Sequence, residues 1–82
     1  MTKRAITKKN LQLTGKLMKY LVDHPEVDDK LPDDASFVLF THADKKLNAI
    51  NAKLAQSLAQ SGTAVVKAME TKDKQHPWKF TS

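Results

Sequence analysis

The sequence contains no cysteine. A disulfide framework and a zinc finger built on thiolates are therefore excluded, because both need that residue. The only two glycines, Gly15 and Gly62, lie far apart, so the chain has no glycine-rich loop of the kind that cradles phosphate groups. No apolar run approaches the roughly 20 residues that a membrane-spanning helix needs. These absences leave a small soluble domain, for which we expect a cytoplasmic location and no membrane partner.

The charge is arranged in blocks along the 82 residues, whose net charge is +5. Residues 1–24 hold six basic side chains and one acidic side chain. Residues 25–44 hold one basic and six acidic side chains, and residues 45–82 hold seven basic and two acidic side chains. Two copies of the chain can therefore associate with the acidic block of one copy against a basic block of the other. A chain this short also buries only about 60–65% of its unfolded surface, and association is a common remedy. Both features favour a homo-oligomer.

The first part of the chain has the spacing of an amphipathic helix from Asn10 to His24, which Pro25 ends because proline disfavours the α region in the residue before it. One face of this helix is expected to hold Leu13, Leu17, Tyr20 and Leu21, widened by Leu11, Met18 and Val22. Residues 1–9 are polar and basic, which predicts a flexible arm.

The rest of the chain predicts a strand–helix–strand unit. Ser36–Thr41 contains an unbroken apolar run that is typical of a strand buried on both faces. A helix follows Asp44 and ends near Gly62, and Thr63–Met69 is the second strand. The length favours parallel pairing with a right-handed crossover.

The predicted fold class is thus a small α/β domain of α-β-α-β order over residues 10–69. Residues 70–82 form a charged tail with an aromatic end. Two strands make a poor independent sheet. A third strand is expected either from the tail or from a second subunit.

Lysine-rich segments suggest non-specific electrostatic binding of nucleic acid, since lysines neutralise phosphates. The single arginine argues against the reading of base edges. The candidate residues are Lys3, Arg4, Lys8, Lys9, Lys16 and Lys19. A solubilising role for the same lysines is the simpler alternative.

Two further candidate sites are small. Thr41, His42 and Asp44 follow the first predicted strand, where open α/β sheets commonly bind ligands. Capping of the next helix by Thr41 or Asp44 explains the same spacing and is favoured. Trp78 and Phe80 would point to one side of an extended tail, either as an anchor for a protein partner or folded back onto the core.

No catalytic constellation, metal-ligand spacing or cofactor motif is recognisable, so we expect neither an enzyme nor a bound metal or cofactor. The three histidines are far apart in the sequence. The acidic residues of the connector lack the ligand alternation and central glycine of a calcium-binding loop.

Several short segments carry a resemblance to known proteins. The segments are Asn10-Leu11, Tyr20-Leu21-x-x-His24-Pro25-Glu26, Leu31-Pro32-Asp33-Asp34-Ala35 and Gly62-x-x-Val65-Val66. The chain resembles a family of short, uncharacterised prokaryotic proteins with an Asn-Leu opening and a Tyr-Leu-x-x-His-Pro-Glu helix end. The resemblance implies the same α-β-α-β order and no activity.

Three functions are expected in this order. The first is a small non-enzymatic interaction module that self-associates. The second is a basic accessory protein that binds nucleic acid, and the third is small-molecule binding at the loop after the first strand.

Overall fold

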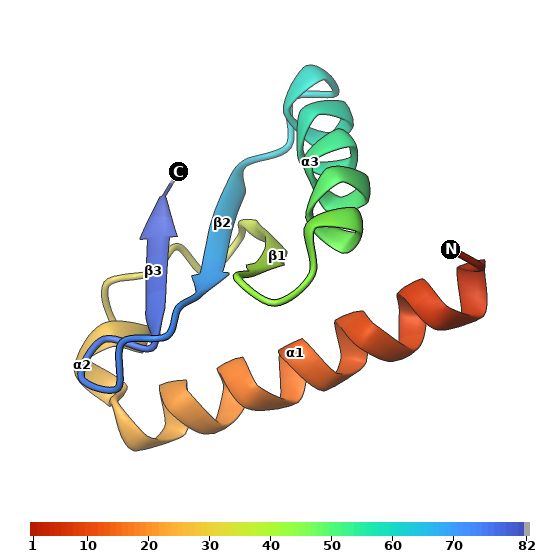
Figure 1. Ribbon diagram of the computed structural model, residues 1–82. Coiled ribbons are helices and arrows are strands. Elements are labelled where there is room, and N and C mark those ends of the chain that lie inside the picture. The colour runs from red at the N-terminus through yellow and green to blue at the C-terminus, as the bar shows by residue number, and fades with distance from the viewer. Residues whose placement is uncertain (82) are drawn as a thin grey trace. The chain divides into compact units, whose positions relative to one another are not determined.

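The computed structural model describes residues 1–81. In chain order the elements are α1 (Lys3–Asp23), α2 (Pro25–Asp28), β1 (Ser36–Thr41), α3 (Lys45–Gln60), β2 (Val65–Glu70) and β3 (Trp78–Thr81) (Figure 1). The chain forms two compact units, Met1–Asp33 with both α1 and α2, and Asp34–Ser82 with the sheet and α3. The architecture is a small mixed α/β fold, as the sequence predicts.

Helix α1 begins seven residues earlier than the periodicity predicts. Thr2 is the N-cap, and its Oγ1 accepts a hydrogen bond of 3.1 Å from the backbone N–H of Ala5. Threonine is a preferred N-cap, and no proline or glycine interrupts the segment that follows it. The flexible arm predicted for residues 1–9 is therefore wrong, because a local cap and good helix formers outweigh the polar composition.

The end of α1 agrees with the expectation from proline. Pro25 occupies the first turn of the short helix α2, and His24 lies between the two helices. The imidazole of His24 stacks on Tyr20 with 4.4 Å between ring centroids, and its Nδ1 lies 3.2 Å from Oε1 of Glu26. The backbone N–H of Glu26 is the main cause that lowers the pKa of its carboxyl, and His24 contributes in the same direction.

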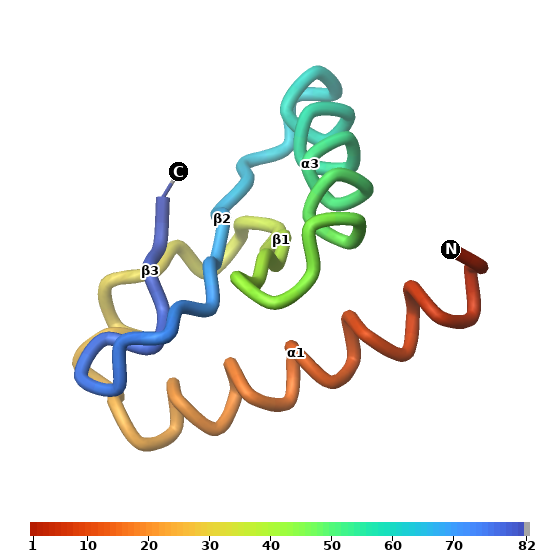
Figure 2. Tube along the Cα trace, in the orientation of Figure 1, coloured from red at the N-terminus to blue at the C-terminus, as the bar shows by residue number. Residues whose placement is uncertain are grey.

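The sheet of the second unit has the strand order β1-β2-β3. β1 and β2 are parallel, with Ser36 beside Val65 and Thr41 beside Glu70. β3 is antiparallel to β2, with Trp78 beside Glu70, and Figure 2 shows the chain turning back after β2 to make this pair. The tail thus supplies the third strand, which was one of the two alternatives that the sequence left open.

Local signals account for both ends of α3. Asp44 is the N-cap, and its side chain accepts a hydrogen bond of 3.0 Å from the backbone N–H of Leu47. At the other end Gly62 has a φ of 86°, in the left-handed region that favours glycine. The N–H groups of Gly62 and Thr63 donate to the carbonyls of Ala59 and Leu58, which is the Schellman pattern.

The second unit buries apolar side chains on both faces of its sheet. On the face that α3 covers, Ala55 of the helix packs with Val38 and Phe40 of β1, and two half-buried residues, Leu58 and Val65, join them. The register places the alternate positions on the opposite face. There the buried side chains are Leu39, Val66, Ala68 and Trp78, none more than 7% exposed. The prediction of a β1 strand buried on both faces is confirmed from Val38 onward, whereas Phe37 is 36% exposed.

Candidate interaction surfaces

Helix α1 has apolar side chains on two faces, and only one of them is buried. Leu13 and Leu17 are buried, as predicted. Leu11, Met18 and Val22 are exposed to 66%, 55% and 76%. At about 100° per residue these three lie roughly 140° around the helix from the Leu13–Leu17 side. The prediction that they widen the buried face is wrong, because helical periodicity places them on the other side of the helix.

Gly15 completes this exposed surface. The spacing of Leu11, Gly15, Met18 and Val22 is four, three and four residues, which keeps all four positions on one line along a helix. A Cβ added at Gly15 would meet nothing within 4 Å, so the glycine leaves an open notch between its neighbours. We call these four residues the outer stripe of α1.

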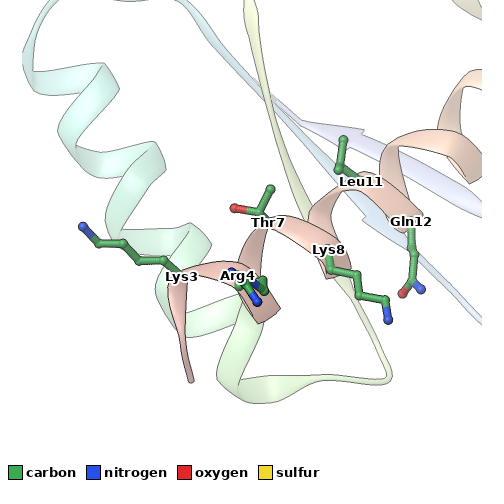
Figure 3. A pocket seen from close by; sticks show the side chains of 6 residues that line it. All are labelled: Lys3, Arg4, Thr7, Lys8, Leu11 and Gln12. Carbon is green, nitrogen blue, oxygen red and sulfur yellow. The ribbon is translucent and has the colours of Figure 1, made fainter.

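Three of the predicted nucleic-acid-binding cations lie in the first two turns of α1, where Lys3 extends to the opposite side from Lys8 (Figure 3). They line a surface hollow of about 710 Å³ whose wall consists of Lys3, Arg4, Thr7, Lys8, Leu11 and Gln12. Figure 3 shows the side chains of Lys8 and Gln12 pointing the same way from successive turns, while Leu11 points away from them. We call Lys3, Arg4 and Lys8 the basic cluster.

The other three predicted cations do not belong to this cluster. Lys9 is half-buried, and both Lys9 and Lys16 interact with other groups of the chain. Lys19 is exposed but lies in the C-terminal half of α1. Helical geometry therefore brings together only part of the set that composition alone suggested.

The loop after β1 is occupied by structural contacts of Thr41 and Asp44. Thr41 is 4% exposed, and its hydroxyl donates a 2.7 Å hydrogen bond to Oε1 of Glu70. The same Oγ1 accepts a hydrogen bond from the N–H of Ala43. Asp44 caps α3, as favoured from the sequence, and His42 is exposed and lines neither hollow described in this section. Ligand binding at this loop stays a prediction.

Two asparagines of α3 cover the outer edge of β1. The N–H groups of Ser36 and His42 donate to the β2 side, so the backbone of the odd-numbered residues of β1 points away from β2. Asn48 Oδ1 accepts from the N–H of Thr41 at 2.9 Å, and Asn48 Nδ2 donates to the carbonyl of Thr41 at 2.7 Å. Asn51, which is 2% exposed, donates from Nδ2 to the carbonyl of Leu39 at 2.8 Å.

These side-chain amides take the place of a neighbouring strand along the C-terminal half of β1. An unpaired strand edge is a template for pairing with another chain, and side-chain hydrogen bonds remove that template. The sequence analysis missed Asn48 and Asn51. The sequence does show two amide side chains on the otherwise apolar side of a helix. The backbone groups that they bind are seven and twelve residues away, so the sequence pattern does not identify those partners.

The aromatic residues of the tail belong to the sheet. Trp78 is 6% exposed and begins β3, and Phe80 lies beside Ala68 of β2. The tail folds back onto the sheet, which is one of the two alternatives that the sequence left open for these residues. A tryptophan with so little exposed surface is not accessible to a partner, so its interpretation as a docking anchor is corrected.

A second hollow lies between α3 and β2 and has a volume of about 590 Å³. Its walls are formed by Ala52, Ala55, Gln56, Ala59, Val65 and Lys67. Small alanines make the hollow, because they leave the helix slim beside the strand. It has few polar groups to orient a ligand.

Within residues 1–81 no group of three metal-binding side chains gathers at one place. Over the same residues, no helix combines the length and the apolar character that crossing a membrane requires.

Comparisons with known proteins identify a family and no activity. No curated protein and no solved structure matches the chain. The model of one family, described as "Family of unknown function (DUF5647)", matches residues 5–76. The match runs from the first turn of α1 through α2, β1, α3 and β2 into the loop that follows β2. The chain therefore belongs to this family of unknown function, DUF5647.

Proposed function

We propose that this protein is a small non-enzymatic interaction module that self-associates. One observation supports the proposal most, namely that the outer stripe of α1 presents three large apolar side chains that are each more than half exposed. Scattered apolar residues are normal on a surface, whereas a contiguous line of them marks a contact site.

The size of the protein supports self-association in particular. The chain has no disulfide bond, because it has no cysteine, and the sheet that residues 1–81 form has three strands. A small fold of this kind gains stability when a partner covers exposed apolar surface.

Sedimentation velocity over a range of concentrations tests the proposal. We expect the mass to rise from 9.2 kDa toward twice that value as the concentration increases through tens of micromolar and above. Met18→Lys should keep the chain at 9.2 kDa, because it places a charge within the outer stripe. Gln12→Lys is the matched control, since it adds the same charge on the same helix outside the stripe. A mass of one chain at every concentration would refute self-association.

Nucleic-acid binding is the second candidate, and the basic cluster is the observation that favours it. Lys3, Arg4 and Lys8 share one hollow on the first turns of α1, where the helix dipole also favours anions. Fluorescence titration with labelled DNA and RNA at two salt concentrations tests this function. Binding should weaken steeply as the salt concentration rises. Lys8→Glu should weaken binding more than Lys53→Glu, a substitution at an exposed position of α3. Equal effects of the two variants would exclude the cluster.

A further inference from the structure

The outer stripe of α1 is self-complementary when two copies of the helix run in opposite directions. In an antiparallel pair centred between Gly15 and Met18, Leu11 of one copy lies opposite Val22 of the other, and Gly15 lies opposite Met18. The longest side chain of the stripe then faces the position that has none. The open space around Gly15 can receive the Met18 side chain, since a Cβ there would meet nothing within 4 Å.

A parallel pair has no such match. It would place Gly15 opposite Gly15 and Met18 opposite Met18, which leaves a gap at one level and crowding at the next. Packing densities in interfaces approach those of protein interiors. A large side chain opposite a small one is therefore favoured over two large or two small side chains opposite each other.

Charge selects the same orientation. The basic cluster, Lys3, Arg4 and Lys8, lies at the start of α1. The segment from the end of α1 to just past α2 carries four acidic side chains, Asp23, Glu26, Asp28 and Asp29, against one basic side chain, Lys30. An antiparallel pair brings the basic end of each copy to the acidic end of the other, at both ends of the contact. A parallel pair would bring like charges together, which is unfavourable.

We infer that the partner of the outer stripe is a second copy of this chain, packed antiparallel so that Met18 of each copy inserts beside Gly15 of the other. This inference rests on the proposed function of self-association and adds the surface, the orientation and the register. The contact is isologous, because the same residues serve both copies.

Cysteine cross-linking tests the register, and the natural absence of cysteine makes every introduced thiol unique. Leu11→Cys and Val22→Cys are purified separately, one of them isotopically labelled, and mixed in a glutathione redox buffer. We expect the mixed 11–22 disulfide to exceed both symmetric disulfides. The two Leu11 positions would be about 16 Å apart along the helix axis, too far for the roughly 7 Å that a disulfide allows. Gln56→Cys, at an exposed position of α3, measures the cross-linking that random collisions produce.

A substitution at the notch provides an independent test. Gly15→Leu fills the space that Met18 occupies, and leucine also favours the helix, so the fold of the single chain is retained. We expect the dissociation constant of the dimer to rise at least about tenfold. A rise of that size corresponds to the lower end of the free-energy cost of overpacking a well-packed contact. Circular dichroism verifies the helix content.

The outcomes separate the inference from the proposed function. If the natural chain never exceeds the mass of one copy, self-association and the inference both fail. If it forms a dimer but the symmetric 11–11 and 22–22 disulfides dominate, or cross-linking does not exceed the Gln56→Cys control, the inference alone is overturned. An unchanged dissociation constant for Gly15→Leu would also overturn it.

Discussion

Replacement of Asn48 by alanine should destabilise the protein more than any exposed substitution on α3. The side chain of Asn48 is half-buried and makes two hydrogen bonds to the backbone of Thr41, one with the N–H at 2.9 Å and one with the carbonyl at 2.7 Å. Thr41 is only 4% exposed. Asn48→Ala therefore removes the partners of two backbone groups that have little other access to water.

The magnitude follows from the cost of unpaired backbone groups. Each buried group that loses its partner costs about 1–3 kcal/mol, and two at the lower end cost about 2–3 kcal/mol. Alanine recovers roughly 0.5 kcal/mol as a better helix former than asparagine. The expected net loss is about 2 kcal/mol. For a domain of this size that loss lowers the melting temperature by roughly 8–16 °C.

Two measurements check this prediction. Urea unfolding gives the free energy of unfolding of the natural chain, of Asn48→Ala and of Lys53→Ala, an exposed control on the same helix. Hydrogen exchange then reports on the Thr41 amide, which should lose protection in Asn48→Ala beyond what the global loss explains. A destabilisation below about 0.5 kcal/mol, the range of ordinary surface substitutions, would refute the role of Asn48 as a cover for the β1 edge.

Three further predictions concern local features. Gly62→Ala should lower the free energy of unfolding by about 1 kcal/mol, because φ is 86° there, whereas Gly15→Ala, measured in dilute monomeric protein, should raise it by a similar amount within α1. Urea unfolding that moved both variants in one direction would contradict this contrast. Thr2→Ala should lower the free energy of unfolding by about 1 kcal/mol and speed amide exchange in the first turn of α1, since Thr2 caps that helix. Unchanged amide exchange in that turn would contradict the cap and support a flexible arm instead. The N–H of Gln75 lowers the pKa of the Asp73 carboxyl, so its stabilising effect should be complete above the ordinary pKa and disappear as the pH falls through the lowered value. A carboxyl titration by NMR that placed this pKa at or above the ordinary aspartate value of 3.8 would contradict the hydrogen bond.

Predictions from short-range chemistry agree well with the structure. The bounds of β1, the proline that ends α1 and the left-handed glycine after α3 all depend on residues within a few positions of each other. Such signals act through local sterics and local hydrogen bonds, and so they can be recognised in a single sequence. The start of α1 was missed although its signal, a threonine cap, is also local, because the basic composition of residues 1–9 was given more weight than the cap.

The candidate site was predicted less completely than the fold. Composition suggested six cations on the first helix and its arm, of which three line one hollow. The loop after β1 was correctly interpreted as a capping segment, but the hydrogen bonds of Thr41 to Asn48 and Glu70, seven and 29 residues away, were not predicted. The outer stripe was assigned to the buried face, because α1 has apolar residues on both sides.

The order and approximate extent of most helices and strands could be predicted from the sequence, as could the three blocks of charge, because these features depend on neighbours along the chain. Only the folded chain shows that the tail pairs with β2 as the third strand of the sheet. The tertiary structure also decided that asparagines of α3, rather than another strand, satisfy the edge of β1. Each of these outcomes depends on groups that are distant in sequence and meet only in the folded chain.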